Sequence, residues 1–321
     1  KAVLEDEPYP VRGLMILGGS PVLSFPDSKS WREAYKKLDC LIVLDRYFTE
    51  DARYADVVFP ACSLFEVPKA VPGPEGPHIV EPLIEPVGES KNDVLIMGAI
   101  AKKLGFGDKL PQTEEELRSW LLSGTAPYAG DFGTSADQKK EKHYKKYETG
   151  ELRADGKPGF PTPSGKLEIC STILEENGFV PYPEYKDVRS IPGLAGKEYP
   201  FTMTSGARSN NRMGVFGANL DKIAEIEPYP FVDINAEDAK EIGIKDGDMV
   251  KVITPFADGT FKAKIRGIAR HAIHIPHGGG SAYMAEPWKN GNVNDLCSLD
   301  YADPMTGFVL IKSVPCRVEK V

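Results

Sequence analysis

Residues 13–45 read GLMILGGSPVLSFPDSKSWREAYKKLDCLIVLD, and this stretch decides the fold of the first half of the chain. Residues 13–17 are all apolar and end at two glycines, a serine and a proline. Residues 28–38 then carry apolar side chains at helical spacing, and residues 40–44 are apolar again. This order predicts a strand, a helix and a second strand. Residues 57–59 add a third strand, so we expect βα units around a mainly parallel sheet.

The middle of the chain loses this regular pattern. Residues 90–104 have the spacing of an amphipathic helix that stops at a glycine. Thr113 begins a capping box that predicts a helix through Leu122. The rest of residues 111–195 is polar and lacks a core of its own. Residues 71–86 are rich in proline and glycine, which predicts a long surface loop.

Strands dominate from residue 199 onward. The predicted strands are residues 201–204, 231–234, 249–254 and 261–265. Asp258-Gly259 is the turn sequence that we expect between the last two. Asn235 is expected to cap one short helix, which ends at Gly243. Together these features predict a compact β-barrel.

Length and composition limit the class of protein. The 321 residues, 41% of them hydrophobic and 27% charged, are enough for two domains with separate cores. The net charge of −8 excludes a nucleic-acid partner held by a basic surface. No run reaches the roughly 20 apolar residues of a membrane helix, so we expect a soluble protein without a direct membrane span. Because Lys1 is not an initiator Met, we expect that the natural N-terminus is lost, and the compartment, prokaryotic-type cytoplasmic or periplasmic, stays unknown.

The cysteines and histidines do not form the pattern of a metal site. The five cysteines are far apart without a CxxC pair, and Cys40 and Cys316 lie in apolar runs where we expect buried, reduced thiols. His271, His274 and His277 would alternate between the two faces of a strand, so they would not converge on one metal ion. No local Ser/His/Asp or Cys/His set is visible. The catalytic residues therefore stay unknown, and no metal ligand is expected.

Small and acidic residues follow the first two predicted strands. In Gly18-Gly19-Ser20, the small side chains let a phosphate come close to backbone N–H groups. Asp45, one strand over, can accept hydrogen bonds from ribose hydroxyls or a guanine edge. Thr49 is expected to cap a short helix after this strand. The full GxGxxG fingerprint is absent, so an ordinary tight turn is the alternative to a nucleotide site.

Polar clusters in the second half suit a ligand rich in heteroatoms. Residues 204–212 read TSGARSNNR, whose guanidinium, hydroxyl and amide groups fit an anion such as a pterin phosphate. A merely solvated loop is the alternative. Asn292 and Asn294 can read both the donor and the acceptor edges of a heterocycle, although asparagines are also common in turns. Lys312 adds a cation nearby in sequence.

Taken in order, these motifs resemble the molybdopterin oxidoreductases of the dimethyl sulfoxide reductase family over essentially the whole chain. Residues 44–66, LDRYFTEDARYADVVFPACSLFE, look like the family's DxxxTETAxxADVVLP segment. Residues 162–169, TPSGKLEI, are similar to its TPSGKIE connection. Residues 233–248, DINAEDAKEIGIKDGD, resemble the INPxDAxxLGIxDGD start of its barrel. The C-terminal residues 303–318 also fit, and they resemble the branch of formate dehydrogenase-like proteins and acetylene hydratase.

The resemblance implies an α/β fold in three parts. These parts are a parallel-sheet βα domain at residues 1–108 that contacts a dinucleotide, a helical and irregular return segment at residues 109–195 that belongs to an absent domain, and a C-terminal double-psi β-barrel at residues 196–321. The implied cofactor is a bis(molybdopterin guanine dinucleotide) with molybdenum or tungsten. The implied cofactor-binding residues are Gly18, Gly19, Ser20, Pro21, Asp45, Thr49, Asp56, Ser205, Gly206, Arg208, Arg212, Asn292, Asn294 and Lys312.

The chain also departs from the family's pattern. Ser20 stands where the family's GxNP loop has an asparagine, and Arg212-Met-Gly stands where many relatives have a histidine. The cysteine motif of a 4Fe-4S cluster and the residue that ligates the metal have no counterpart. We therefore expect both in a missing N-terminal half of the same protein. That half is the first expected partner, and an iron–sulfur electron-transfer subunit is the second.

The function that the resemblance implies is the cofactor-binding portion of an oxidoreductase, inactive as this chain alone. Two alternatives stay open: a non-redox hydratase or transhydroxylase of the same family, and a non-catalytic binding or structural subunit with the same domains. A nicotinamide-dependent dehydrogenase would explain the first βα units only.

Overall fold

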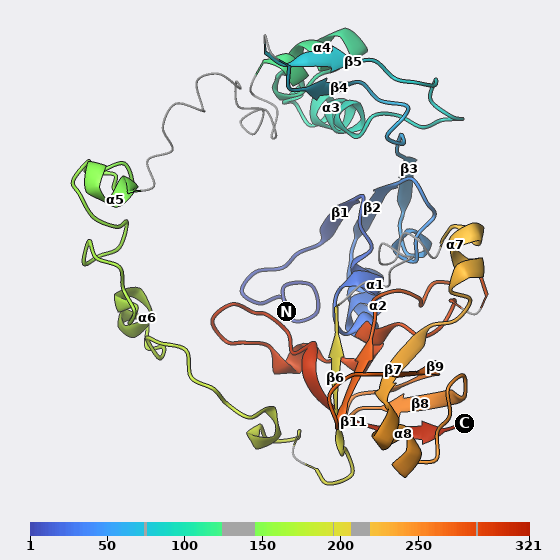
Figure 1. Ribbon diagram of the computed structural model, residues 1–321. Coiled ribbons are helices and arrows are strands. Elements are labelled where there is room, and N and C mark those ends of the chain that lie inside the picture. The colour runs from blue at the N-terminus through green and yellow to red at the C-terminus, as the bar shows by residue number, and fades with distance from the viewer. Residues whose placement is uncertain (74–75, 124–144, 195, 207–218, 287) are drawn as a thin grey trace. The chain divides into compact units, whose positions relative to one another are not determined.

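The computed structural model describes residues 1–73, 76–123, 145–194, 196–206, 219–286 and 288–321 (Figure 1). The chain divides into two compact units. One consists of Lys1–Ala61 and Asp187–Val321, and the other is Cys62–Lys186. The compact units have other bounds than the predicted parts at residues 1–108, 109–195 and 196–321. Those parts were defined by which of them contact a cofactor, and this division stays a prediction.

The first unit begins with a parallel sheet of three strands. The strands are β1 (Gly13–Leu17), β2 (Cys40–Asp45) and β3 (Val57–Pro60), in the order β1-β2-β3. Between them lie α1 (Pro21–Ser24), α2 (Ser28–Lys37) and η1 (Asp51–Arg53). The strand–helix–strand prediction for residues 13–45 is confirmed. Because all three strands run the same way, their carboxyl ends share one edge of the sheet.

The helix α2 forms where the sequence predicts it, for local reasons. The Asp27 side chain accepts a hydrogen bond from the Ser30 amide at 3.1 Å and so caps the first turn. Lys36 and Lys37 occupy the last turn, where cations suit the helix dipole. Tyr35 on the inner face is buried against the sheet in an apolar cluster with Ile16, Leu41 and Val43. Burial of this face fixes the helix on the sheet.

The second part of the first unit is a closed barrel of six strands. They are β6 (Phe201–Ser205), β7 (Phe231–Asn235), β8 (Met249–Ile253), β9 (Asp258–Arg266), β10 (Ala272–Ile275) and β11 (Lys312–Lys320), in the order β10-β6-β11-β8-β9-β7. The β6/β10 and β7/β9 pairs are parallel, and the other pairs are antiparallel. Alternate side chains such as Met203, Val250 and Phe261 are fully buried in one apolar cluster inside the barrel. The expected fold class, a parallel βα sheet followed by a barrel, is confirmed.

One turn in the barrel is not where the sequence suggests. Asp258 and Gly259 lie inside β9, and Ile253 pairs with Asp258, so the prediction of a turn at Asp258-Gly259 is wrong. The β8/β9 hairpin instead turns through residues 254–257. There the Thr254 hydroxyl oxygen accepts hydrogen bonds from the amides of Phe256 and Ala257, both at 3.2 Å. The Thr254 side chain thus satisfies these two amides and stabilises the turn at residues 254–257.

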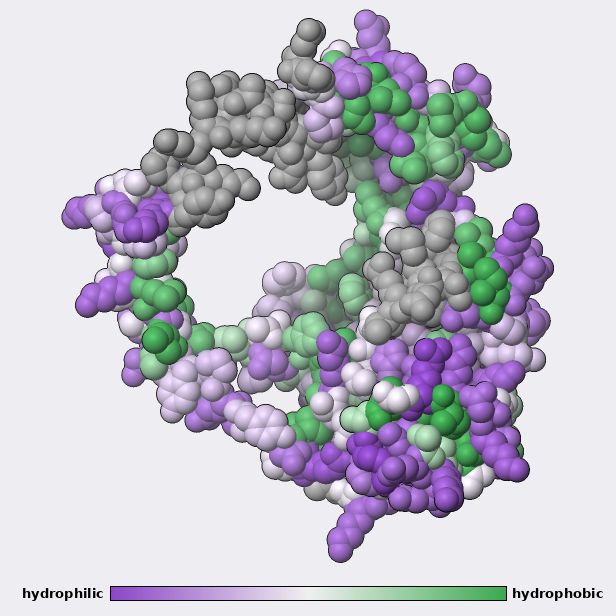
Figure 2. All heavy atoms as spheres, in the orientation of Figure 1, coloured by the Kyte–Doolittle hydropathy of each residue, from purple (hydrophilic) through white to green (hydrophobic). Residues whose placement is uncertain are grey.

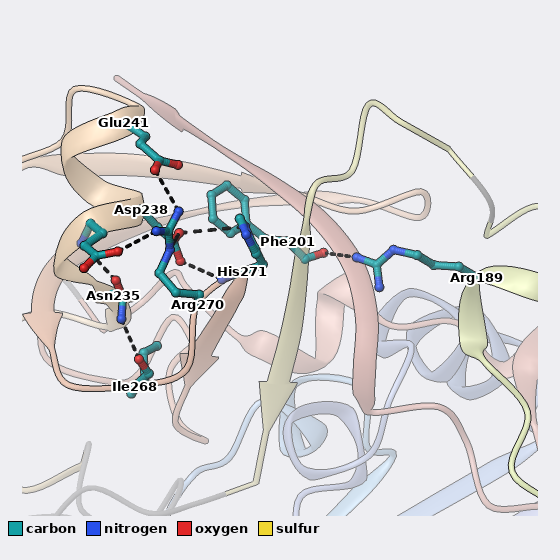
Figure 3. Close-up of polar contacts among 9 residues, drawn as sticks. Arg189, Phe201, Asn235, Asp238, Glu241, Ile268, Arg270 and His271 are labelled. Carbon is teal, nitrogen blue, oxygen red and sulfur yellow. Dashed lines mark hydrogen bonds and ion pairs between the residues drawn. The ribbon is translucent and has the colours of Figure 1, made fainter.

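Short helices precede or connect the barrel strands, and one of them is held by an ion-pair cluster. They are η4 (Val188–Ser190), α7 (Asp221–Ile226), α8 (Ala236–Glu241), η6 (Val293–Leu296) and η7 (Leu299–Tyr301). As predicted, the Asn235 side chain caps α8, and Gly243 follows its end with a φ of +72°. Arg270 reaches three carboxylates on α8, at distances of 2.5–2.8 Å (Figure 3). The innermost, Asp238, is only 1% exposed and also accepts the His271 amide at 2.7 Å. The cluster therefore ties the loop before β10 to α8.

In the part of it that the structure describes, the second unit contains two longer helices and a small hairpin. The elements are β4 (Lys69–Val71), β5 (His78–Val80), α3 (Asp93–Lys103), η2 (Gly107–Lys109), α4 (Glu114–Leu122), α5 (Lys146–Thr149) and α6 (Thr172–Glu176). The capping box at Thr113 is present as predicted. The helix expected at residues 90–104 begins at Asp93, because the Asn92 side chain accepts the Val94 amide at 2.9 Å. The prediction of a surface loop at residues 71–86 was wrong in part, since β4 and β5 pair there.

Residues 145–186 bury no apolar side chain among those that the structure describes. Leu167 is 71% exposed, Ile169 85% and Tyr185 91%, and green apolar residues stand at the surface of this segment in Figure 2. Hydrophobic burial within the chain therefore contributes little to holding it. None of the helices in the described ranges has both the length and the apolar character needed to cross a membrane.

The cysteines are free thiols. Cys316 is buried in the barrel, and this burial raises the pKa of its thiol to about 12, as suits an inert core residue. Cys40 is only partly buried, so the expectation of a buried thiol is confirmed for Cys316 and not for Cys40. Cys40 opens β2 at the amino edge of the sheet, where the strand is less covered.

Candidate functional site

The structure brings Gly18 and Asp45 to the same edge of the sheet. Leu17 pairs with Leu44, and the Gly18 amide donates to the Leu44 carbonyl oxygen at 2.9 Å. Gly18 has a φ of +58°, which turns the chain sharply out of β1 and favours glycine. The Asp45 carboxylate is half-buried and accepts the Tyr47 amide at 3.1 Å. A small loop and an acceptor thus adjoin at the strand ends, where ligands of parallel sheets usually bind.

Burial makes Asp45 an unusual surface acid. Loss of solvent raises its pKa above the ordinary value, and backbone hydrogen bonds from Tyr47 and Arg46 oppose that rise. A half-buried carboxylate gains more from a donor-rich ligand than a fully solvated one, because less water must be removed when the ligand binds. Asp45 is therefore suited to accept N–H or O–H donors.

Ser20 and Pro21 lead from this edge into α1, and a buried acid fixes them. Asp51 is completely buried, and its carboxylate accepts hydrogen bonds from the Ser20 hydroxyl, from the Val22 amide at 3.1 Å and from the Tyr35 hydroxyl at 2.7 Å. The sequence predicted a short helix after Thr49 and gave Asp51 no role. Its role was missed, because hydrogen bonds to residues 16 to 31 positions away leave no local pattern. No signal in the neighbouring sequence could have found it.

A second cluster forms at the edge of the barrel. β6 and β10 are parallel, with Ser205 opposite Ile275, so the residues after these strands adjoin. The Ser205 hydroxyl donates to the Ile311 carbonyl oxygen at 2.9 Å. A β-carbon added at Gly206 would lie 3.7 Å from His277 Nε2 and 3.9 Å from Lys312 Cε. Gly206, His277 and Lys312 therefore converge, and a glycine next to a cation and an imidazole suits an anionic group. His277 was considered only as a metal ligand from sequence, and its place here was missed.

Asn292 and Asn294 lie inside the molecule, at 3% and 1% exposure. The Asn292 side-chain amide donates to the Ser28 hydroxyl at 3.1 Å, and that of Asn294 donates to the Leu23 carbonyl oxygen at 2.7 Å. These bonds join the barrel to the α/β part of the same unit. The cofactor-binding role of the two asparagines stays a prediction, and their contacts with other described residues support the fold.

A glycine loop connects the two edges. Gly278, Gly279 and Gly280 have φ values of +135°, +85° and +97°, and they follow β10 directly after Pro276 and His277. A β-carbon on Gly280 would lie 2.8 Å from the Asn292 β-carbon and 3.2 Å from Leu23 Cδ2. The loop therefore passes closely between barrel and sheet, where only glycine fits.

The same loop also contacts the segment after β2. The Ala282 amide donates to Glu50 Oε2 at 3.4 Å, and the Phe48 and Tyr283 rings meet at 4.9 Å. Glu50 is buried, whereas about half of each ring is exposed. The edge with Asp45 and the edge with Gly206 thus belong to one compact unit.

Four implied residues are not placed with these two edges. The Thr49 hydroxyl accepts the Ala52 amide at 3.3 Å and caps η1, as predicted for the start of a helix, although the helix is a single 3-10 turn. Asp56 accepts the Leu41 amide at 2.7 Å, which places it at the amino edge of the sheet, opposite to Asp45. Arg208 and Arg212 lie outside the described residues.

The three histidines have different surroundings. His274 Nδ1 lies 3.1 Å from Asp233 Oδ2 on the outside of the barrel, and His271 lies at the start of β10 beside Asp238. His277 lies at the other end of β10, near Gly206. Within the described ranges, no three His, Cys, Asp or Glu side chains are grouped to hold a metal ion.

Two family models match the chain. Residues 5–103 match the model described as molybdopterin oxidoreductase, and residues 202–315 match the model of the molydopterin dinucleotide binding domain. The first match covers the sheet with Gly18 and Asp45, and the second covers most of the barrel with Ser205, Gly206 and Lys312. Each edge described above thus lies within a matched region.

Individual proteins are similar over most of the chain. The alpha subunit of an F420-dependent formate dehydrogenase from Methanocaldococcus jannaschii is 30% identical over 285 residues, which are 85% of this chain and 39% of the relative. A probable oxidoreductase, YoaE, from Bacillus subtilis is 31% identical over 261 residues, or 78% of this chain and 36% of the relative. The solved structure of acetylene hydratase from Pelobacter acetylenicus superposes with a TM-score of 0.79 at 21% identity, covering 100% of this chain and 46% of that one. The chain thus spans less than half the length of these relatives.

Proposed function

Because the chain belongs to the molybdopterin oxidoreductases of the dimethyl sulfoxide reductase family, we propose that it is the C-terminal cofactor-binding portion of a molybdenum or tungsten oxidoreductase. A molybdopterin cofactor follows from the matched dinucleotide-binding domain. The finer proposal is a bis(molybdopterin guanine dinucleotide), of which this chain holds the nucleotide side of one dinucleotide and part of a pterin or its phosphate.

The observation that carries this proposal is the juxtaposition of Gly18 with Asp45 at the carboxyl edge of the sheet. A β-carbon at Gly18 would have no atom within 4 Å, and one at Gly19 would make only ordinary contacts, with Ile16 Cγ2 and the Leu17 carbonyl oxygen both 4.0 Å away. A phosphate can therefore approach the backbone. Asp45 is placed to accept hydrogen bonds from the amino and imino groups of a guanine or from ribose hydroxyls. The residues fit the nucleotide end of the cofactor.

The barrel edge fits an anionic group. Lys312 and His277 lie beside Gly206, whose missing side chain leaves room for a phosphate or a polar pterin edge. Arg208 and Arg212, outside the described residues, are proposed to add further cations there. When bound, the metal with its dithiolene ligands supplies the redox chemistry. The residues of this chain then bind and orient the organic part of the cofactor.

The rest of the enzyme is also part of the proposal. Some relatives are alpha subunits of formate dehydrogenases, and the chain spans less than half their length. We propose that the remaining part of the same polypeptide provides a 4Fe-4S cluster and the ligand of the metal. An iron–sulfur subunit is the proposed electron partner.

Cofactor content of the full-length protein tests this function. The purified protein should contain molybdenum or tungsten by elemental analysis, and acid hydrolysis should release guanosine monophosphate, measured by chromatography. A full-length protein with neither metal nor guanine nucleotide would instead favour the non-catalytic binding subunit. A metal-loaded protein that hydrates substrate without exchange of electrons would identify the hydratase alternative.

A further inference from the structure

Asp51 is a buried carboxylate that accepts three hydrogen bonds around the start of α1. Its donors come from three different places: the Ser20 hydroxyl in the loop after β1, the Val22 amide in α1 and the Tyr35 hydroxyl in α2. Asp51 itself has no exposed surface. Three donors to one buried carboxylate compensate its loss of solvent and leave it one geometry.

The first turn of α1 consequently has no N–H group left for a ligand. Pro21 has none, the Val22 amide is bound to Asp51, and the amides of Leu23 and Ser24 both donate to the Ser20 carbonyl oxygen, at 3.0 and 2.8 Å. An anion cannot bind at this helix start without displacing Asp51. The usual phosphate position at the beginning of a helix is therefore taken by the protein's own carboxylate.

Two amides of the loop are left. The Gly18 amide is bound to the Leu44 carbonyl oxygen at 2.9 Å, whereas the amides of Gly19 and Ser20 donate to no acceptor among the residues that the structure describes. The two amides flank the Gly19 α-carbon, where an added β-carbon would make only ordinary contacts at 4.0 Å. A phosphate that approached this loop would meet these two N–H groups.

We infer that Asp51 is a positioning residue for the nucleotide: it closes the first turn of α1 to anions and, through Ser20, holds the Gly19 and Ser20 amides as the donor pair for a phosphate. This inference rests on the proposed function. It also joins two departures from the family's pattern. Ser20 stands for the asparagine of the GxNP loop, Asp51 stands for the second threonine of TETA, and the two side chains bind each other.

The test uses the full-length protein with its cofactor and follows the release of the whole cofactor after dilution, measured as the guanine nucleotide that acid hydrolysis then sets free from it. Asp51→Ala should release the nucleotide at least about tenfold faster than wild type, since it frees the Ser20 side chain and the α1 amide at once. Asp51→Asn keeps an acceptor oxygen for Val22 and Tyr35, so release should stay within about twofold of wild type. Ser20→Ala should accelerate release, and the Ser20→Ala/Asp51→Ala double variant should match Asp51→Ala because both act through one contact.

Asp238→Ala is the matched control. It also removes a buried carboxylate that binds one side chain and one backbone amide, but in α8 of the barrel. Thermal midpoints are measured for all variants. Asp238→Ala should lower the midpoint and leave the release rate within about twofold of wild type, because α8 is not part of the nucleotide loop.

Two results would overturn the inference. One is release from Asp51→Ala at the wild-type rate. The other is equal acceleration in Asp51→Ala and Asp238→Ala at equal loss of thermal stability, which would mean that Asp51 acts only through stability. If Asp51→Ala does not fold, Tyr35→Phe and Ser20→Ala carry the same expectation at about twofold to fivefold, since each removes one donor. A wild-type protein without guanine nucleotide would refute the proposed function instead.

Discussion

The Gly18 amide donates a 2.9 Å hydrogen bond to the carbonyl oxygen of Leu44, the residue before Asp45. This bond continues the β1/β2 ladder by one residue beyond the strand and fixes the glycine loop at the level of the carboxylate. A ligand bound at this edge would meet a backbone surface and an acid held in register by the sheet itself.

Asp45→Ala in the full-length protein should weaken nucleotide retention by about 1.5–3 kcal/mol, the range for losing a charge-assisted hydrogen bond. Retention is measured as bound guanine nucleotide after serial dilution. Asp39→Ala is the control, because Asp39 is an exposed acid at the other end of β2. Equal occupancy in Asp45→Ala and wild type would contradict the assignment of Asp45.

Gly19→Ala should separate ligand binding from folding. The added methyl group would find its nearest protein atoms 4.0 Å away, and the Gly19 backbone is one that other residues adopt, so thermal stability should be unchanged. The methyl group would occupy the space through which a phosphate approaches, and nucleotide occupancy should fall at least about tenfold. Gly267→Ala, at a glycine whose added β-carbon would have no atom within 4 Å, should change neither quantity. Normal occupancy in Gly19→Ala would show that no phosphate comes close there.

Glu66 should make the stability of the second unit depend on acid pH. Hydrogen bonds from Ser63 and from the Val87 amide hold its pKa at about 2, below the ordinary 4.5. A lowered pKa means that the carboxylate stabilises the folded state above about pH 4.5 and that this contribution is lost as the pH falls toward 2.

Glu66→Gln measures this contribution. The thermal midpoint of wild type should exceed that of the variant at about pH 6, and the gap should narrow steadily down to about pH 3. Glu184→Gln, at an exposed glutamate, serves as the control. A gap that stays constant with pH would mean that the charge of Glu66 does not contribute.

Arg270→Ala should destabilise the barrel by about 1.5–3 kcal/mol, because Asp238 would keep its buried charge with the His271 amide as its remaining donor. Urea unfolding followed by tryptophan fluorescence measures the change. The exposed Arg317–Glu319 pair gives the comparison, and Arg317→Ala should cost less than about 1 kcal/mol. Equal costs for the two arginines would rule out a special role of the α8 cluster.

The isolated 321-residue chain should retain little cofactor, because the two edges contact only part of a large ligand. Elemental analysis of the purified chain should find molybdenum and tungsten well below one atom per chain, whereas the full-length protein should approach it. Stoichiometric metal in the isolated chain would show that these two edges suffice.

The sequence predicted the elements whose signals are local. The strand at residues 13–17, the capping box at Thr113 and the Asn235 cap of α8 depend on neighbours within a few positions, and all three were predicted correctly. The prediction of a turn at Asp258-Gly259 failed because the Thr254 hydroxyl oxygen accepts two amide hydrogen bonds, a contact that a two-residue turn rule does not include. Local patterns therefore determined the elements, and the misplaced turn was decided by another local contact, that of the Thr254 side chain.

The candidate site was predictable in part. The adjacency of Gly18 and Asp45 was predictable because residues that end adjacent parallel strands must adjoin, and their binding role stays a prediction. Asp51 and His277 were missed, since their contacts join residues far apart in the sequence. Asn292 and Asn294 have ligand-type side chains, yet their amides bind Ser28 and Leu23. A side chain's chemistry does not by itself distinguish a ligand contact from a contact within the protein.

The three consecutive glycines at residues 278–280 limit how the protein can distinguish between ligands that contact them. Gly279 and Gly280 have no space for a side chain, since a β-carbon there would come within 2.6 Å of the Asn290 carbonyl oxygen and 2.8 Å of the Asn292 β-carbon. A ligand that contacts these residues can therefore meet only backbone peptide groups and the shape of the backbone. Discrimination between chemically different ligands must come from the residues on either side of the glycines. A mutational search for altered selectivity should begin there.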